Sequence, residues 1–405
     1  MKGVFIILDG VADLPTQALG QKTPLEYAKT PHLDQIAESS KIDHCYTVKE
    51  DYTPESHEAV VSLLGYDPQT ADRGSLEAYG LGIKLKNGDL AFRCNFGTIE
   101  DLDTLNVLDR RAGRTLTTKE AKILAKAINE QVKLPFKFEF YTSTQHRAVL
   151  IFRGGFSSNI TKIDSKKEKL QWAKPLDDED DSKLSAELIN TFVRKSYHIL
   201  TTHPINIARA KKGLYAANVL LCRGAGNKVP KFKKLKGKWL SLGFMPLEIG
   251  IAKAAGMSIQ KTKVPKLKNI DVYSNIYLGL KRNMKAAIKM LKKNQKKYDY
   301  FYIHFKATDI PGHDNKPFDK VKIIEMLDER FFSFLKKFIK ENKLIITADH
   351  ATPCKLKAHS ADPVPVLIYP HPKNKKTHNQ RFTEMQAKEG RKIQGRKLLQ
   401  ENFFS

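Results

Sequence analysis

The chain has 405 residues, of which 41% are hydrophobic, so it is long enough for two domains or for one domain with a large insertion. No stretch approaches the ~18 consecutive apolar residues of a membrane helix, which argues against a membrane-spanning protein. The net charge of +26 favours an anionic partner.

The positive charge is concentrated in lysine clusters at residues 228–238, 281–297 and 373–376. These clusters lack the interleaved aromatic residues of a groove for single-stranded nucleic acid, and no motif that reads nucleic acid is present. We therefore interpret most of them as solvated helix faces. We expect a small anionic substrate as the partner, no specific nucleic acid and no membrane, and the oligomeric state stays open.

Residues 1–8 (MKGVFIIL) are expected to form the first strand of the fold. The apolar run is too short for a signal peptide and leads directly into Asp9 without a cleavage site of small residues, so we expect a cytoplasmic protein. Asp9, followed by Gly10, stands at the carboxyl end of this strand, a position typical of metal sites. Residues 23–37 then indicate a turn and a helix.

Ser56 precedes an apolar run of helical period that ends at Gly65. One interpretation makes it the N-cap of that helix. The other makes it a nucleophile for phosphate, because a helix N-terminus offers free N–H groups and a partial positive charge to an anion. The spacing alone does not decide between the two.

The middle of the chain, residues 91–213, alternates helical patterns with strands and offers no plausible metal cluster. We expect it to be an inserted α/β cap domain on a catalytic domain formed by residues 1–90 and 214–405. An expected loop of the insertion carries three arginines: Arg110, Arg111 and Arg114. Guanidinium groups match the oxygens of phosphate and carboxylate, although a solvated charge is the simpler explanation for any single arginine.

The C-terminal half is expected to supply more strands and helices of the catalytic domain. Residues 214–222 resume a buried-strand pattern, and residues 247–257 indicate a helix. A further strand is expected at residues 364–369, and the tail is expected to end in a helix around residues 382–399.

Two other strands of this half lead into carboxylate and imidazole side chains. The strand DYFYIHF runs into Asp309, with His313 four residues later, and the apolar run LII of a buried parallel strand leads to Asp349 and His350. His359 follows after a loop. Ligands of open α/β sheets bind at the carboxyl ends of the strands, and these side chains are ligands for Zn²⁺ or Mn²⁺.

Seven side chains are therefore candidate metal ligands: Asp9, Ser56, Asp309, His313, Asp349, His350 and His359. Two divalent ions about 4 Å apart need about that many ligands, and such a pair holds the entering and leaving oxygens of a phosphoryl displacement. The four cysteines are scattered singly and form no C-x-x-C pair, and we interpret Cys354, near these ligands, as a small buried residue.

Several segments carry a resemblance to a known family: ILDG (7–10), KTPLEYAKTPHLD (22–34), SLLGYDP (62–68), RGSLEAYGLGI (73–83), AFRCNF (91–96), DRRAGR (109–114), KATDIPGHD (306–314) and ADHATPCKLKAHSADPVPVLI (348–368). They run nearly end to end and in order. In these segments the sequence resembles the cofactor-independent phosphoglycerate mutases of the archaeal type, members of the alkaline phosphatase superfamily.

The resemblance implies an α/β fold with a largely parallel sheet flanked by helices, as in alkaline phosphatase, plus the smaller cap. It implies interconversion of 3-phosphoglycerate and 2-phosphoglycerate in glycolysis and gluconeogenesis, through a phosphorylated serine. It also implies two divalent metal ions, with Mn²⁺ preferred over Zn²⁺, Co²⁺ or Mg²⁺, and no 2,3-bisphosphoglycerate.

The family pattern also implies a role for individual residues, with Ser56 as the nucleophile. One metal site would consist of Asp309, His313 and His359. The other would consist of Asp9, Ser56, Asp349 and His350. The substrate would be held by arginines, for which the candidates are Arg93, Arg110, Arg111, Arg114 and Arg223.

Glu55, His57 and Ser165 depart from the family pattern on the substrate side. An acidic residue beside a phosphate acceptor is unfavourable unless Glu55 points away or helps to hold a metal. Two alternatives therefore stay open. One is a metal-dependent phosphatase or phosphotransferase on another small metabolite, such as homoserine. The other is a catalytically silent basic binding protein, against which the complete set of ligands argues.

Overall fold

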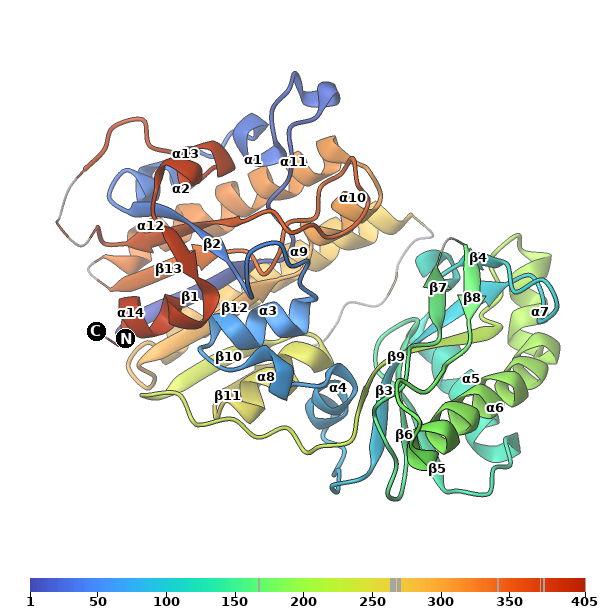
Figure 1. Cartoon of the computed structure of the whole chain (residues 1–405). Coiled ribbons are helices and arrows are strands. Elements are labelled where there is room, and N and C mark those ends of the chain that lie inside the picture. Colours follow the sequence, from blue (N-terminus) through green and yellow to red (C-terminus); the bar gives the residue numbers. More distant parts are fainter. Residues whose placement is uncertain are drawn as a thin grey trace.

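The computed structural model describes residues 1–166, 168–262, 267, 271–340, 342–371, 373 and 376–404. The chain forms two lobes (Figure 1), the larger built on an eight-stranded sheet and the smaller on a five-stranded sheet. Each lobe has a hydrophobic core of its own.

The large sheet has the strand order β11 (Ser258–Lys261), β10 (Trp239–Gly243), β12 (Tyr300–Phe305), β1 (Gly3–Leu8), β13 (Lys343–Thr347), β14 (Val364–Tyr369), β2 (Lys41–Tyr46) and β15 (Lys392–Gln394). The first five strands are parallel to one another, β14 is antiparallel to both of its neighbours, and β15 is parallel to β2. The central strands β1 and β12 are buried along their whole length, as apolar strands covered on both faces must be. The predicted largely parallel sheet is confirmed.

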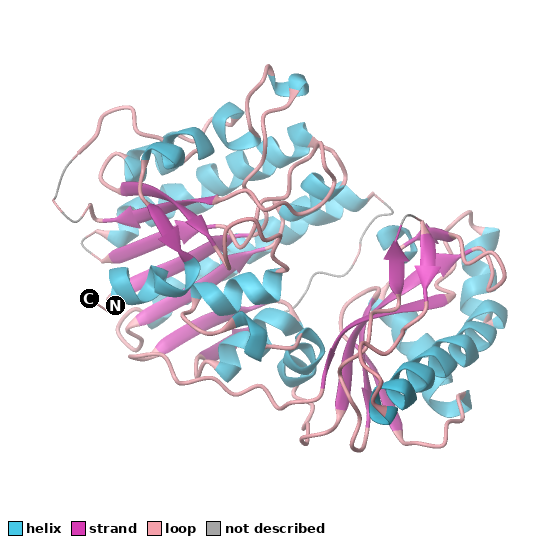
Figure 2. Ribbon diagram, viewed as in Figure 1, coloured by secondary structure: helices cyan, strands magenta, loops and turns pink. Residues whose placement is uncertain are grey.

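Helices lie on both sides of this sheet (Figure 2). They are α1 (Pro24–Tyr27), α2 (Pro31–Ala37), α3 (Ser56–Leu63), α4 (Arg73–Leu81), α8 (Pro246–Ala254), α9 (Val272–Asn294), α10 (Asp309–His313), α11 (Pro317–Leu327), α12 (Ser333–Ile339), α13 (Glu384–Glu389) and α14 (Leu398–Phe403). Among the described residues, no helix is long and apolar enough to cross a membrane.

The single helix predicted around residues 382–399 is wrong. The segment contains α13, then β15, and then a short 3₁₀ turn, Gly395–Lys397, before α14. The helical period is interrupted because the chain crosses β2 at close range: a Cβ at Gly390 would lie 2.2 Å from the carbonyl oxygen of Ile42. Only a glycine fits there, and β15 then pairs with β2.

The small sheet consists of β3 (Leu90–Ile99), β4 (Val107–Asp109), β5 (Phe138–Thr142), β6 (Arg147–Phe152) and β9 (Val219–Gly226). A two-stranded sheet, β7 (Asp164–Lys166) and β8 (Lys169–Gln171), and the helices α5 (Thr118–Gln131), α6 (Asp180–Thr202) and α7 (Pro204–Lys211) complete the lobe. The long helices α5 and α6 lie along one face of the small sheet (Figure 1).

Strand β9 belongs to the small lobe, although the sequence placed it at the start of the catalytic segment 214–405. It pairs with β3 in antiparallel register, and residues 219–222 belong to the core of the small lobe. An apolar run carries no information about which sheet it joins, because both sheets offer a buried neighbour. We therefore propose that the inserted cap domain runs from β3 through β9.

The second face of the small sheet is turned toward the large lobe. Side chains alternate along β3. Phe92 and Cys94 belong to the core of the small lobe, whereas Ala91 packs with Ala78 of α4, and Arg93 lines a cavity between the lobes. This face of the cap can therefore contribute to a site.

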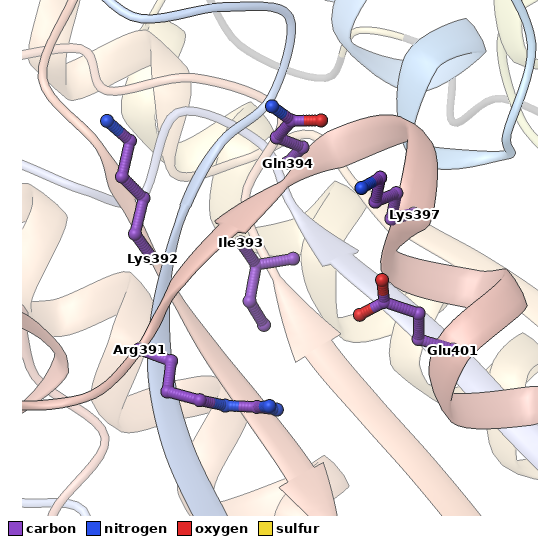
Figure 3. A pocket seen from close by; sticks show the side chains of 6 residues that line it. All are labelled: Arg391, Lys392, Ile393, Gln394, Lys397 and Glu401. Carbon is purple, nitrogen blue, oxygen red and sulfur yellow. The ribbon is translucent and has the colours of Figure 1, made fainter.

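A smaller hollow of about 300 Å³ lies at the edge strand β15 (Figure 3). Of its cations, Lys392 is paired with Glu50, and Arg391 lies 3.7 Å from Asp43. None of the residues singled out from the sequence lines this hollow, so we sought the site in the cavity between the lobes.

Candidate active site

A cavity of about 600 Å³ lies between the two lobes. The large lobe contributes Ser56, Asp309, His313 and His359 to its lining, and the small lobe contributes all five predicted arginines. A cavity of this size, formed where two lobes meet, is typical of a small-molecule site.

Asp9, Asp349 and His350 form a buried cluster at the carboxyl ends of two neighbouring parallel strands, β1 and β13. Their ligand atoms all lie within 4.8 Å of one another. Oδ2 of Asp349 has no hydrogen-bond partner among the described residues, whereas Oδ2 of Asp9 is contacted by the Lys306 ammonium and lies 3.1 Å from Nε2 of His304. Two buried carboxylates beside an imidazole carry more negative charge than one ammonium neutralises, so this donor set fits a divalent metal ion.

Asp309, His313 and His359 form a second, half-buried cluster of the same compactness. The Nε2 atoms of His313 and His359 lie 3.4 Å and 3.8 Å from Oδ1 of Asp309. Each Nδ1 lies 3.0 Å from a backbone carbonyl, that of Lys357 or Pro54. Because a carbonyl can only accept, Nδ1 carries the hydrogen and the lone pair of Nε2 stays free for a metal.

Ser56 is the first residue of α3, and Glu55 is the N-cap, so the interpretation of Ser56 as the N-cap is wrong. Its Oγ lies 3.1 Å from Nε2 of His350. At this position the hydroxyl is beside the buried cluster and also beside the free N–H groups of the first helical turn. The arrangement suits a nucleophile that accepts phosphate.

The charges of the two clusters follow from their neighbours. Burial raises the pKa of Asp9, but the Lys306 ammonium and the neighbouring His304 together lower it below its usual range. Burial likewise opposes ionisation of Asp309, and His313 lowers its pKa. Burial would lower the pKa of His350, but Asp349 raises it to about 9. Asp9 and Asp309 are therefore both charged at neutral pH.

Sequence reasoning missed Lys306 and the residues around it. Lys306 follows β12 directly, and its Nζ contacts Asp9 and lies 3.1 Å from Oε1 of Glu248. His304, on the same strand, places Nε2 3.1 Å from Asp9. The signal was present, because Lys306 leaves a strand end three residues before Asp309, but a lysine in a lysine-rich chain attracts no notice.

Glu55 points toward Arg73, which is another residue that the sequence did not single out. The Arg73 guanidinium lies 3.0 Å from Glu55 and 3.1 Å from Glu77. Burial raises the pKa of Glu55, but Arg73 together with Arg223 and the nearby imidazoles lowers it below its usual value. The neighbouring His57 is buried against Arg73, and its pKa falls to about 3. The acidic departure from the family pattern is thus neutralised within the lobe.

The predicted arginines differ in what they contact. Arg93 and Arg223 stand opposite each other on β3 and β9. Nε and Nη1 of Arg93 are buried without a hydrogen-bond partner in the described part of the chain. Burial and the neighbouring Arg223 lower the pKa of Arg93 well below its usual value. Oε1 of Glu77 lies 3.7 Å from Nε of Arg93 and offsets part of the repulsion between the two arginines. Because Nη1 still has no hydrogen-bond partner in the described part of the chain, Arg93 is suited to a substrate oxygen.

Arg110 and Arg114 are already engaged by carboxylates. Arg110 binds Asp164 through Nε at 3.1 Å and Nη2 at 2.5 Å, and Arg223 lies 3.6 Å from the same carboxylate. Arg114 binds Asp314 of the large lobe.

Arg111 is buried, and burial and the neighbouring Arg114 lower its pKa to about 10. Sequence reasoning also missed two further cavity residues, His146 directly before β6 and Arg147 at its start, because a single His-Arg pair carries no pattern.

Comparison with known proteins identifies the family. The family model described as 2,3-bisphosphoglycerate-independent phosphoglycerate mutase matches residues 37–206, and the alkaline phosphatase model matches residues 265–402. The mutase of Pyrococcus abyssi with that same description is 38% identical over 400 residues, which cover 96% of this chain and 93% of the relative. The chain belongs to the 2,3-bisphosphoglycerate-independent phosphoglycerate mutases.

Other members of the family agree with this placement. Mutase 1 of Archaeoglobus fulgidus is 38% identical, with 98% of this chain and 96% of the relative covered. A solved structure from Pyrococcus horikoshii is 30% identical with a TM-score of 0.73, covering 100% of this chain and 96% of that chain. The cofactor-independent mutase of Thermoplasma acidophilum is 26% identical with a TM-score of 0.56, covering 99% and 98%. The predicted family and fold class are confirmed.

Proposed function

We propose that the chain interconverts 3-phosphoglycerate and 2-phosphoglycerate, with Ser56 as the residue that carries the phosphoryl group between the two positions. The observation that carries the proposal is the place of the Ser56 hydroxyl, 3.1 Å from His350 at the start of α3 and in the lining of the cavity. Membership in the family supports the same reaction.

The transfer requires one bond to form as another breaks. Ser56 gives up its hydroxyl proton and Oγ bonds to phosphorus while the bond from phosphorus to the glycerate oxygen breaks, and the glycerate oxygen takes up a proton. Glycerate then turns within the cavity, and its other hydroxyl loses its proton and bonds to phosphorus while the bond from phosphorus to Ser56 Oγ breaks and Ser56 regains a proton. The two clusters would hold divalent ions, which would supply Lewis-acid chemistry to the serine hydroxyl and positive charge to the phosphoryl oxygens.

The protein's own groups position the reactants. The N–H groups at the start of α3 face a phosphoryl group on Ser56. Lys306 offsets the negative charge of Asp9 and Glu248 next to it. The unpartnered donors of Arg93 are placed to hold the glycerate carboxylate, so that the molecule is retained while it turns. The small lobe covers the cavity and limits the access of water.

We extend the proposal to the metal ions and to the place of the chain in the cell. One ion is held by Asp9, Ser56, Asp349 and His350, and the other by Asp309, His313 and His359. Mn²⁺ is the first choice, because carboxylate and imidazole ligands suit it. The partner is the small phosphorylated substrate, the oligomeric state stays open, and a role in glycolysis and gluconeogenesis implies a cytoplasmic protein.

The test is an assay of 3-phosphoglycerate with Mn²⁺ and without 2,3-bisphosphoglycerate, run on the wild type and on Ser56→Ala. The wild type is expected to form 2-phosphoglycerate. Ser56→Ala should lose at least about 10³-fold in rate, as is usual when a covalent nucleophile is removed. Ser258→Ala, at an exposed serine on the edge strand β11, serves as the control.

Two outcomes would contradict the proposal. Release of inorganic phosphate without 2-phosphoglycerate would make the chain a phosphatase that uses the same serine. Full mutase activity in Ser56→Ala would remove the serine from the mechanism.

A further inference from the structure

A bidentate ion pair joins the two lobes beside the cavity, whose lining includes Arg114. Nη1 and Nη2 of Arg114 lie 2.5 Å and 2.9 Å from the two carboxylate oxygens of Asp314. Both side chains are partly buried. A planar guanidinium that meets a carboxylate through two hydrogen bonds fixes the orientation of both groups, which a single contact does not.

A tyrosine completes this contact from the large lobe. The Tyr273 hydroxyl, in the first turn of α9, donates to Oδ2 of Asp314 at 2.9 Å. Burial and the charge of Asp314 raise the pKa of Tyr273. The hydroxyl therefore keeps its proton and remains a hydrogen-bond donor to Asp314.

The loop that carries Arg114 is held rigidly in the small lobe. Ala112, Gly113 and Arg114 have positive φ angles of 45°, 64° and 56°. The Asp109 carboxylate accepts from the N–H groups of Arg111 and Gly113, both at 2.7 Å. Consecutive residues in the left-handed region are strained, and such strain persists only where neighbouring groups impose it.

Asp314, the partner of Arg114, is next in sequence to a candidate metal ligand. Asp314 follows His313 directly and is the C-cap of α10, the short helix that begins at Asp309. The ion pair therefore connects the arginine loop of the cap with the helix that carries two of the three side chains in the second cluster.

We propose that Asp314 and Tyr273 are positioning residues that clamp Arg114, and with it the loop 110–114, over the cavity during phosphoryl transfer. The proposal rests on the phosphoserine pathway given above. It gives Arg114 a role at the closure between the lobes in place of the direct substrate contact expected from the sequence. The clamp keeps water away from the phosphorylated Ser56 until the glycerate hydroxyl attacks.

The two fates of the phosphoserine are chemically distinct. With the clamp closed, the glycerate hydroxyl bonds to phosphorus, the bond from phosphorus to Ser56 Oγ breaks, and the product is 2-phosphoglycerate. With the clamp open, a water oxygen bonds to phosphorus, the same bond breaks, and a proton from the water returns to Ser56. The products are then inorganic phosphate and free glycerate.

The ratio of these products tests the clamp. ³¹P NMR follows 3-phosphoglycerate, 2-phosphoglycerate and inorganic phosphate in one sample. Asp314→Asn is expected to raise the ratio of phosphate to 2-phosphoglycerate about tenfold, because a charge-assisted bidentate bond is lost. Tyr273→Phe removes one hydroxyl only and should raise the ratio about threefold. Loss of stability alone would lower both products equally and leave the ratio unchanged.

The matched control is Tyr277→Phe. Tyr277 lies one turn further along α9, and its hydroxyl binds Asp319, so both partners are in the large lobe. This variant removes the same kind of bond from the same helix without touching the contact between the lobes. Its product ratio should equal that of the wild type.

A double-mutant cycle separates the clamp from a direct substrate contact. If Arg114 acts through Asp314, then Arg114→Gln combined with Asp314→Asn should raise the ratio no further than either change alone. Effects that multiply in the double variant, or a wild-type ratio in both Asp314→Asn and Tyr273→Phe, would overturn the inference. Acid-quenched wild type without phosphate on Ser56 would instead overturn the phosphoserine pathway itself.

Discussion

Ser56 owes its position to the residues on either side of it. Glu58 accepts a hydrogen bond from the N–H of Glu55 at 2.8 Å, which starts α3 at Ser56 and leaves its hydroxyl free of a capping role. Glu55 is drawn away by Arg73. The nucleophile position therefore tolerates an acidic neighbour, because that neighbour has a cation of its own.

The aspartates and histidines of the site were predictable residue by residue, whereas the cations were not. Asp9 and Asp349 end parallel strands, and parallel strands in one sheet bring such ends to the same edge. Lys306 and Arg73 carry no comparable signal, because the chain has 70 lysines and arginines and spacing does not single out the few that are buried. Their roles depend on contacts that only the fold creates.

Glu384 gives a prediction about pH at the scale of one residue. The side chain is buried, accepts hydrogen bonds from Thr23 at 2.7 Å and from the N–H of Asp13 at 2.9 Å, and burial raises its pKa from 4.5 to about 7. Between these pH values the folded state holds the proton more tightly than the unfolded chain. The contribution of Glu384 to stability is thus present below pH 4.5 and is lost as the pH rises through 7.

Glu384→Gln removes this titration. The free energy of unfolding of the wild type, minus that of the variant, should fall by up to about 3 kcal/mol from pH 4.5 to pH 7. Urea titrations at a series of pH values measure it. The exposed Glu389→Gln at the end of the same helix is the control, and a difference that rises with pH for Glu384→Gln would contradict the shift.

Helices α4 and α8 are packed backbone against backbone. A Cβ at Gly80 would lie 1.8 Å from the carbonyl oxygen of Pro246, and one at Gly250 would lie 1.9 Å from that of Leu76. This close approach places Arg73 and Glu77 of α4 in the lining of the cavity. The position of the site thus depends on an element contact that only glycines permit.

Gly80→Ala is expected to lower the free energy of unfolding by about 3 kcal/mol, because the added methyl group forces the two helices apart. Chemical denaturation measures the change. Gly155→Ala is the matched control, since a Cβ there meets nothing within 4 Å, and it should change stability by less than about 0.5 kcal/mol. Equal effects of the two substitutions would show that α4 and α8 are not in close contact.

At the scale of elements, the apolar runs predicted the strands β1, β12, β13 and β14, because a short run of apolar residues is typical of a buried strand. The composition of a strand does not show which strand it pairs with. For this reason β9 was assigned to the catalytic segment 214–405, although it pairs with β3. The helix predicted around residues 382–399 was wrong for a related reason. Helical periodicity over a short segment does not show that part of the segment pairs with β2 as strand β15.

At the scale of the whole molecule, positively charged side chains gather where the two lobes meet. Arginines from both lobes, together with Lys306 and Lys357, line the cavity, and they outnumber its carboxylates. A field of this sign attracts a phosphorylated anion and is weakened by salt. The proposed division into a catalytic lobe and an inserted lobe agrees with the distribution of the candidate metal ligands, since all seven lie outside residues 91–213.

We expect the KM for 3-phosphoglycerate to rise several-fold between about 0.05 and 0.5 M NaCl, with little change in kcat, because salt screens the attraction of the substrate more than it affects bound reactants. Steady-state kinetics at several salt concentrations test this. Lys233→Gln, in the exposed cluster 231–238, should leave both KM and its salt dependence unchanged. A KM that is independent of salt would contradict an electrostatic role for the cavity.

The central claim is that Ser56 carries the phosphoryl group. Its most direct test mixes the enzyme and Mn²⁺ with 3-phosphoglycerate, quenches the reaction with acid within milliseconds and locates any phosphate by peptide mass spectrometry. We predict a phosphorylated peptide that contains Ser56, formed before 2-phosphoglycerate accumulates and absent in Ser56→Ala. Production of 2-phosphoglycerate with Ser56 unmodified at every time point would contradict the account.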